Sequence, residues 1–242
     1  MKPLFITLEG ADCAGKASQS KLLADAIGAT LFSSPDYTTP SGILLKKHLH
    51  EEWAAAQPDA VATQQAQVGL NRVNDVLGRS YEEGRLLYRA LPTQDNMIAR
   101  QALMVLNRLE MQVKVEEALK SGPVVADRWH DSAIVYGGVE GVPVPEGFLQ
   151  PDLRILLDMD VATAQERLRL RGKPDANEKD LEKQQKVIDA YRKRWRFFSD
   201  HPPATPWVGH FSRCNWAAVD GRKSIEEVAA DVMAHFQAIC PR

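Results

Sequence analysis

The chain has 242 residues, of which 44% are hydrophobic and 26% are charged, and its formal net charge is −2. This length suits one globular α/β domain, with or without an insertion. The charge shows no global basic excess of the kind that binds duplex nucleic acid or an anionic membrane. We therefore expect a protein with no stable nucleic-acid partner and no membrane attachment.

The three cysteines, Cys13, Cys214 and Cys240, have neither an even count nor the spacing of a metal site. They predict reduced thiols in a cytosol-like compartment. The sequence contains no run of roughly eighteen apolar residues, and its first residues lack the pattern of a signal peptide. We expect a soluble, cytoplasmic protein.

A phosphate-binding pattern stands near the beginning of the chain. The apolar run at residues 4–8 predicts a buried strand, and Gly10, Gly15 and Lys16 follow it in the order G-x-x-x-x-G-K. Glycines let such a loop bend so that several backbone N–H groups meet one phosphate, and the lysine adds a positive charge. The helix predicted at residues 17–27 directs its N-terminus toward the same anion. Together these elements predict a nucleotide phosphate site.

The first helix departs from this pattern at one position. Ala17 stands where a Ser or Thr hydroxyl usually reaches the magnesium ion, and Ser18 follows one place later. A methyl group cannot ligate a metal. Water or carboxylates elsewhere must therefore hold the ion, or the protein is a weak catalyst. The apolar side of the helix is predicted to comprise Leu22, Leu23, Ala26 and Ile27.

Strands and helices alternate along the rest of the chain. The predicted strands lie at about residues 4–9, 29–32, 123–126, 153–157 and 216–219. Right-handed crossovers between them imply a five-stranded, mostly parallel sheet with helices on both faces. We predict a single α/β domain over residues 1–242, with a helical insertion at 54–93 and a lid at 167–182.

Two segments between these elements allow several interpretations. The loop at residues 33–42 follows the second strand, where α/β sheets bind ligands, so it is either a substrate loop or a plain connector. The insertion at residues 54–93 contains helix formers together with Gly69, Gly78 and Gly84. It could cover a substrate, make a subunit contact or have no specific role.

Charged residues follow the third strand and stand at the end of the helix predicted at residues 161–170. Asp127 and Arg128 end an apolar strand, where phosphate-loop proteins keep a magnesium-directed carboxylate. An ordinary ion pair at the end of a strand is the alternative. Arg167, Arg169 and Arg171 precede a Gly and a Pro. They could close over a polyphosphate as a lid, or form a solvated helix end.

Several separated stretches together resemble one family, the thymidylate kinases among the P-loop nucleoside monophosphate kinases. They are FITLEGADCAGK, SSPDYTTPSG, LNRLEMQ, VVADRWHDSAIVYGG, QPDLRILLDMD and VDGRKSIEEV, and they span nearly the whole chain apart from residues 54–93. The resemblance implies the three-layer P-loop NTPase fold, ATP and Mg²⁺ as cofactors, nucleotide substrates and a homodimer.

Carried over residue by residue, the resemblance implies roles for individual side chains. The catalytic residues are Lys16, Asp12, Arg128 and Arg171. ATP is bound by Gly10, Ala11, Asp12, Cys13, Ala14, Gly15, Lys16, Ala17 and Ser18, with Arg167 and Arg171 from the lid. The acceptor is bound by Asp12, Asp36, Tyr37, Met104, Arg108, Arg128, Ser132 and Tyr136. Asp127, with Glu9, holds magnesium.

Some positions differ from the pattern of this family. Cys13 stands where some members have a loop arginine, and Ala176 stands where others have a lid arginine, so Arg171 or Arg169 must supply that charge. Met104 replaces an aromatic residue that commonly stacks on thymine.

We therefore expect ATP-dependent phosphorylation of a deoxynucleoside 5′-monophosphate, either dTMP or a related or modified one. The alternatives are a kinase of another small acceptor, and a nucleotide-binding protein of low turnover that acts through a partner. The changed residues at positions 13, 17, 104 and 176 put thymidylate itself in question more than the kinase chemistry.

Overall fold

A computed structural model describes the chain at residues 3–49, 96–142, 144, 148–172, 180–200 and 215–239. The predicted insertion at 54–93 lies outside these residues, as do Cys214, Cys240 and residues 173–179 of the predicted lid. No helix within the described ranges is long and apolar enough to cross a membrane.

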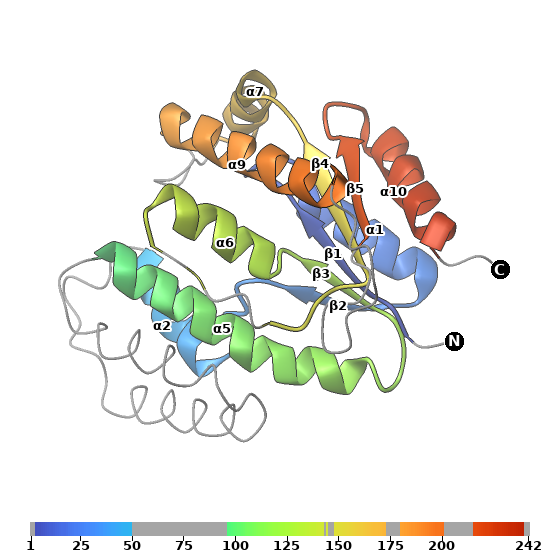
Figure 1. Ribbon diagram of the computed structural model, residues 1–242, viewed down its shortest axis with the longest axis horizontal. Coiled ribbons are helices and arrows are strands. Elements are labelled where there is room, and N and C mark those ends of the chain that lie inside the picture. The colour runs from blue at the N-terminus through green and yellow to red at the C-terminus, as the bar shows by residue number, and fades with distance from the viewer. Residues whose placement is uncertain are drawn as a thin grey trace.

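The described strands form one parallel sheet of five strands in the order β2-β3-β1-β4-β5 (Figure 1). Their bounds are β1 Phe5–Glu9, β2 Thr30–Ser33, β3 Val124–Asp127, β4 Leu153–Asp158 and β5 Asn215–Asp220. Each bound lies within one residue of the prediction. The predicted three-layer P-loop NTPase fold is confirmed.

Helices cover both faces of the sheet. In Figure 1, α1 and α10 lie together on one side, and α5, α6 and α9 lie on the other. The helices are α1 Lys16–Ile27, α2 Pro40–Leu49, α5 Asn96–Ala118, α6 His130–Val139, α7 Val161–Arg171, α9 Leu181–Asp200 and α10 Ile225–Ile239.

Strand β4 shows how the two cores arise. Successive side chains of a strand point to opposite faces. Leu153, Ile155 and Leu157 join the core beneath α1 and α10, whereas Leu156 joins the core beneath α6 and α9. All four leucine and isoleucine side chains are buried. This explains why four of the six residues of the strand are apolar, as expected for a parallel sheet covered on both faces, although Arg154 interrupts the run.

The buried side of α1 differs from the prediction. Leu22 is 42% exposed and Ala26 is also exposed, so placing them on the buried side was wrong. Lys16, the first residue of the helix, faces inward, and its orientation determines which of the later residues face the core. Its buried residues are Lys16, Gln19, Ser20, Leu23 and Ala24.

Helix α2 begins inside the segment that was expected to be a loop. Proline is favoured in the first turn of a helix, where its missing N–H has no partner to lose, and Pro40 is the first residue here. The Thr39 hydroxyl accepts a hydrogen bond from Gly42 N at 3.1 Å, which is the contact of an N-cap residue. The connector is therefore limited to residues 34–39.

Candidate active site

The register of the sheet brings the predicted site residues to one edge. Asp127, the last residue of β3, lies opposite Leu8 of β1 and Ser33 of β2. The glycine loop leaves β1 at this edge, directly beside the end of β3. Strands β3 and β2 lie on one side of β1 in the sheet, and strands β4 and β5 lie on the other. Such a switch in strand order is where parallel α/β sheets bind ligands.

The glycine loop has a backbone that its sequence makes possible. Gly10 has φ 142°, and a Cβ there would lie 2.7 Å from the carbonyl oxygen of Leu157. Gly15 has φ 88° and comes directly before α1. Both positions therefore require glycine. Cys13 adopts φ 63° without being glycine, a conformation that is uncommon for a residue with a side chain.

Lys16 turns back over this loop. Its Nζ donates a hydrogen bond to the carbonyl oxygen of Ala11 at 2.5 Å, and the residue is 6% exposed. Burial, together with the charge of Arg128, lowers the pKa of the Lys16 amine to about 8, although the charge of Asp12 opposes this shift. The ammonium is thus held among other charges, ready to pair with an anion that would restore its pKa.

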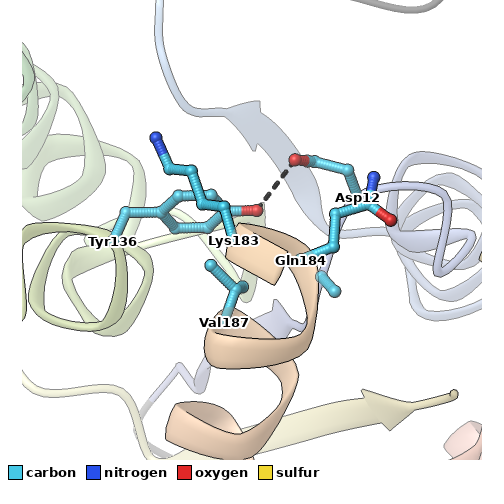
Figure 2. A pocket seen from close by; sticks show the side chains of 6 residues that line it. Asp12, Tyr136, Lys183, Gln184 and Val187 are labelled. Atoms are coloured by element: carbon cyan, nitrogen blue, oxygen red, sulfur yellow. Dashed lines mark hydrogen bonds between the residues drawn. The ribbon is translucent and has the colours of Figure 1, made fainter. Parts of the chain in front are cut away.

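Arg128, Asp12 and Tyr136 contact one another beside the loop. The Arg128 guanidinium forms an ion pair with Asp12 and donates to the carbonyl oxygen of Gly10 at 3.2 Å. The Tyr136 hydroxyl donates to Asp12 Oδ2 at 2.9 Å, as the dashed line in Figure 2 shows. Arg128 also lies over the Tyr136 ring, 5.4 Å from its centre. The structure thus joins three predicted site residues from different elements.

The pKa of Asp12 depends on the cations that surround it. Burial alone would raise the pKa of Asp12, but Arg128, Lys16, the Tyr136 hydrogen bond and Arg171 together lower it. Its carboxylate therefore stays ionised. Arg171, the last residue of α7, therefore contributes to the positive potential at Asp12.

Glu9 lies beneath the loop and is fully buried. Its Oε1 accepts from Trp129 N at 2.8 Å, and its Oε2 accepts from the Ser132 hydroxyl at 2.6 Å. Burial raises the pKa of Glu9, and the nearby charge of Asp131 adds to this. Both carboxylate oxygens thus have protein donors, and the role of Glu9 toward a metal remains a prediction.

Asp127 has a different environment from Glu9. Its Oδ1 is buried and has no hydrogen-bond partner among the residues that the structure describes. No group of three or more His, Cys, Asp or Glu side chains that could hold a metal occurs within those residues. Mg²⁺ is typically held by one or two carboxylates, with phosphates and water completing its shell. The orphaned oxygen of Asp127 fits this mode of binding.

Arg108 approaches the same region from α5. It is 3% exposed, its Nε donates to the carbonyl oxygen of Trp129 at 2.8 Å, and its NH1 donates to that of Met104 at 3.0 Å. Burial, together with the charge of Arg128, lowers the pKa of Arg108 to about 10, although the charge of Glu9 opposes this shift. The two arginines predicted to hold the acceptor phosphate are therefore electrostatic neighbours.

Asn107 holds the loop after β2 against α5. Its Oδ1 accepts from Asp36 N at 2.8 Å, and its Nδ2 donates to the carbonyl oxygen of Asp36 at 2.9 Å and to Thr39 Oγ1 at 2.7 Å. A Cβ at Gly42 would lie 1.9 Å from the Asp36 carbonyl oxygen, so the closed loop requires glycine there. Our sequence reasoning assigned no role to Asn107, although its neighbour Arg108 was predicted.

The two loop residues predicted to bind the acceptor face different surroundings. The Asp36 carboxylate accepts from Thr38 N at 2.9 Å and from Lys114 Nζ at 2.7 Å. It therefore stabilises the loop and pairs with α5 rather than joining the cluster around Asp12. Tyr37 is 40% exposed.

The arginines of the predicted lid have three different positions. Arg167 donates to the carbonyl oxygens of Cys13 at 3.3 Å and Gly221 at 2.6 Å, so it links the glycine loop to the end of β5. Arg169 pairs with Glu166 on the exposed face of α7. Arg171 acts on Asp12, as described above. Of the two arginines considered for the missing lid charge, Arg171 is the one whose charge acts on Asp12, and its role stays a prediction.

A small hollow, open to solvent, lies beside Asp12. Figure 2 shows Tyr136 and Asp12 meeting on one side and residues of α9 on the other. The hollow is lined by Ala11, Asp12, Tyr136, Lys183, Gln184 and Val187. The α9 residues were not predicted as site residues, because a charged helix gives no signal of what it faces. Tyr191, also on α9, was missed because a lone tyrosine on a helix reads as core.

The carboxyl edge of this parallel sheet carries a glycine loop, a buried lysine and two neighbouring arginines. These features define the class of P-loop phosphotransferases. The comparisons with known proteins narrow this class. The family model for thymidylate kinase matches residues 79–201, which is 123 of the 242 residues and just over half of the chain. The chain belongs to the thymidylate kinase family and is a nucleoside monophosphate kinase.

Individual relatives agree with this assignment. The thymidylate kinase of Rhodopseudomonas palustris (strain BisB18) is 29% identical over 96% of this chain and 88% of its own length. The probable thymidylate kinase of Pyrococcus horikoshii is 27% identical over 97% of this chain and 96% of its own length. The solved structure of thymidylate kinase from Candida albicans superposes with a TM-score of 0.63 at 18% identity, covering 98% of this chain and 92% of that one. That structure supports the fold.

Proposed function

We propose that this protein transfers the γ-phosphoryl group of ATP to the 5′-phosphate of a deoxynucleoside monophosphate, either dTMP or a related or modified deoxynucleotide. The observation that carries this proposal is the contact between the glycine loop and the cluster of Arg128, Asp12 and Tyr136. In this proposal the glycine loop holds the donor phosphates and the cluster holds the acceptor, so these contacts support two adjacent sites at one edge of the sheet. The names of the relatives support a nucleotide acceptor.

The donor side of this site depends on the glycine loop. Its backbone N–H groups and Lys16 would hold the β- and γ-phosphates, and the partly desolvated ammonium gains most from a nearby anion. Arg171 would add positive charge where negative charge develops during transfer. Catalysis then consists of positioning and charge stabilisation, without a covalent intermediate.

The acceptor side depends on the second cluster. Arg108 and Arg128 would hold the 5′-phosphate, and a guanidinium fork suits the geometry of phosphate oxygens. Asp12 would accept a hydrogen bond from the 3′-hydroxyl. Tyr136, with Ser132 one turn earlier, would line the sugar and disfavour a ribose 2′-hydroxyl. Met104 would contact the base with a flexible thioether, which tolerates more than one base.

Magnesium would be held by Asp127, whose Oδ1 lacks a protein partner within the described ranges. Because Ala17 supplies no hydroxyl, phosphate oxygens and water must provide the other ligands. When bound, the ion would neutralise charge on the phosphates. Asp127 itself accepts no proton in this scheme and serves to place that positive charge beside the loop.

A coupled assay of ADP formation tests the proposal. The acceptors are dTMP, dUMP, dCMP, dAMP and dGMP, their ribose forms, several modified bases, and the nucleosides without a 5′-phosphate. We expect one deoxynucleoside monophosphate to be preferred and the nucleosides to be inactive. Arg128→Lys should abolish most of this activity, whereas the matched control Arg169→Lys, on the exposed face of α7, should not change it.

Two other outcomes would contradict the proposal in different ways. Turnover of nucleosides without a 5′-phosphate would indicate a kinase of another small acceptor. ATP binding without turnover of any acceptor would indicate a nucleotide-binding protein of low turnover, which Ala17, exposed in the first turn of α1, would then help to explain.

We also propose that the protein assembles as a homodimer, as its resemblance to the family implies. Light scattering coupled to size exclusion should give twice the mass of one chain. A mass equal to that of one chain at assay concentrations would contradict this.

A further inference from the structure

A buried tyrosine on α9 contacts two residues beside the proposed donor and acceptor sites, Ser132 and Glu9. Tyr191 lies on α9 and is 1% exposed. Its hydroxyl oxygen is 2.7 Å from Ser132 Oγ and 3.3 Å from Glu9 Oε2. The residue is fixed by packing as well, because it belongs to the core that includes Val187 and Ile188 of the same helix.

The directions of these hydrogen bonds follow from the chemistry of the partners. The Ser132 hydroxyl donates to Glu9 Oε2 at 2.6 Å, and a serine hydroxyl has only one proton to give. The Ser132 oxygen must then act as an acceptor toward its other neighbours. These are the Tyr191 hydroxyl and Arg128 NH1, which lies at 3.3 Å.

Arg128 needs such support because of its backbone. Its φ is 66°, a left-handed conformation that costs free energy for a residue other than glycine. Its guanidinium is held on one side by Asp12 and on the other by the Gly10 carbonyl and Ser132. A hydroxyl that fixes the orientation of Ser132 therefore also limits the positions that Arg128 can take.

We propose that Tyr191 is a positioning residue of the acceptor site: through its hydrogen bond to Ser132 it keeps Arg128 aimed at the acceptor phosphate. This role rests on the proposed function, in which Arg128 binds that phosphate. Tyr191 itself touches no substrate in this scheme. The first turns of α9 line the hollow beside Asp12. Through Ser132, Tyr191 connects this helix to Arg128, the residue after β3.

The variant Tyr191→Phe tests this proposal because it removes the hydroxyl and retains the ring. We expect the KM for the acceptor to rise roughly five- to tenfold, the effect of losing one buried hydrogen bond, with the KM for ATP unchanged within about twofold. Ile188→Val is the matched control, since it loosens the same core without touching the hydroxyl. It should lower the melting temperature and leave both KM values unchanged.

A double-mutant cycle separates positioning from a general loss of packing. Ser132→Ala removes the group through which Tyr191 acts, so adding Tyr191→Phe to it should raise the acceptor KM by less than about twofold more. If the two effects multiply instead, Tyr191 acts independently of Ser132 and the proposal is wrong.

A measurement without substrate distinguishes this proposal from the proposed function. In protein with ¹⁵N-labelled arginine, the Arg128 Nε–H signal, assigned by its loss in Arg128→Lys, should shift in Tyr191→Phe and not in Ile188→Val. An unchanged signal overturns the positioning role, whatever the kinetics. A shifted signal in a protein that phosphorylates no monophosphate would support the coupling of Tyr191 to Arg128 and overturn the kinase function.

Discussion

Two clusters in the described part of the chain pair arginine with aspartate and differ in how completely the charges are matched. One joins Arg128 to Asp12 at the carboxyl edge of the sheet, where the side chains are 16% and 24% exposed. The other joins Asp131 of α6 to Arg154 of β4 and Arg194 of α9, and there Asp131 is fully buried.

The second cluster is satisfied within the protein. Arg154 Nε and Arg194 Nε each donate to a different oxygen of Asp131 at 2.5 Å. Asp131 carries one negative charge and the two arginines carry two positive charges, so other groups must stabilise the remaining positive charge. Arg154 donates to Gln150 Oε1 at 2.5 Å and lies over the Trp216 ring, and Arg194 lies over the Phe198 ring.

The first cluster leaves polar atoms for a ligand. Asp127 Oδ1 has no hydrogen-bond partner within the described part of the chain, and the Lys16 amine has a pKa lowered to about 8 by burial and by Arg128. The same residue types therefore serve two purposes. Where every charge has a protein partner the cluster stabilises the fold, and where charges remain incompletely matched it can bind phosphate and metal.

The largest effect that we expect separates the two clusters by stability. Asp131→Asn leaves two buried guanidinium groups without a matching anion and should lower the free energy of unfolding by about 3–5 kcal/mol. Asp12→Asn, at the partly exposed cluster, should cost much less stability and abolish most activity. Urea denaturation of both variants measures this. Equal losses of stability would remove the distinction between the clusters.

The next effect is on catalysis. Lys16→Ala should lower kcat/KM by about 10²–10³-fold, as loss of a positioned cation at a transferring phosphate does. The free energy of unfolding should change little, since the buried ammonium is costly to desolvate. Steady-state kinetics with the preferred acceptor, beside a urea melt, measure both quantities. Activity within tenfold of the unmodified protein would show that Lys16 does not contact the phosphates.

A third effect concerns pH. Because the pKa of Lys16 is about 8 in the free protein and that of an ordinary lysine is 10.5, the ammonium is lost above pH 8 and kcat/KM should fall there. The sign for stability is opposite. Between those values the unfolded chain binds more protons at this site, so the contribution of Lys16 to stability rises with pH.

The other cluster should not titrate in this range. Burial alone would raise the pKa of Asp131, but His130, Arg154 and Arg194 together hold it far below its usual value, so this carboxylate stays ionised. A pH–rate profile from about pH 6 to 9.5 tests the difference, with Lys16→Arg as the control that should remove the alkaline limb. A flat profile for the unmodified protein would contradict the assignment.

Much of the fold could be predicted because its signals are local. Each strand contains at least two consecutive apolar residues, and each was placed within one residue. The glycine loop was predicted from spacing alone, since its glycines are required by backbone conformation. The buried side of α1 was predicted wrongly at Leu22, because polar residues such as Gln19, which donates to the Ile225 carbonyl, face inward there.

The contacts that complete the site could not be predicted in this way. Tyr191 and Ser132 are separated by 59 residues, and Arg167 and Gly221 by 54. Such contacts depend on the order of strands in the sheet and on the packing of α9 and α7 over it. The resemblance to a family indicated that Arg167 belongs to the donor side, but the structure places its guanidinium on backbone carbonyls.

Those contacts of Arg167 lead to the smallest expected effect. A lysine cannot donate in two fixed directions, so Arg167→Lys should lose one of the bonds to Cys13 and Gly221. We expect the KM for ATP to rise about three- to fivefold, the acceptor KM to stay unchanged, and the free energy of unfolding to fall by about 1 kcal/mol. Arg169→Lys, at an exposed arginine that pairs with Glu166, should change none of the three. If Arg167→Lys altered the acceptor KM instead, the link between the glycine loop and β5 would extend to the cluster around Asp12, and the two sides of the site would not be independent.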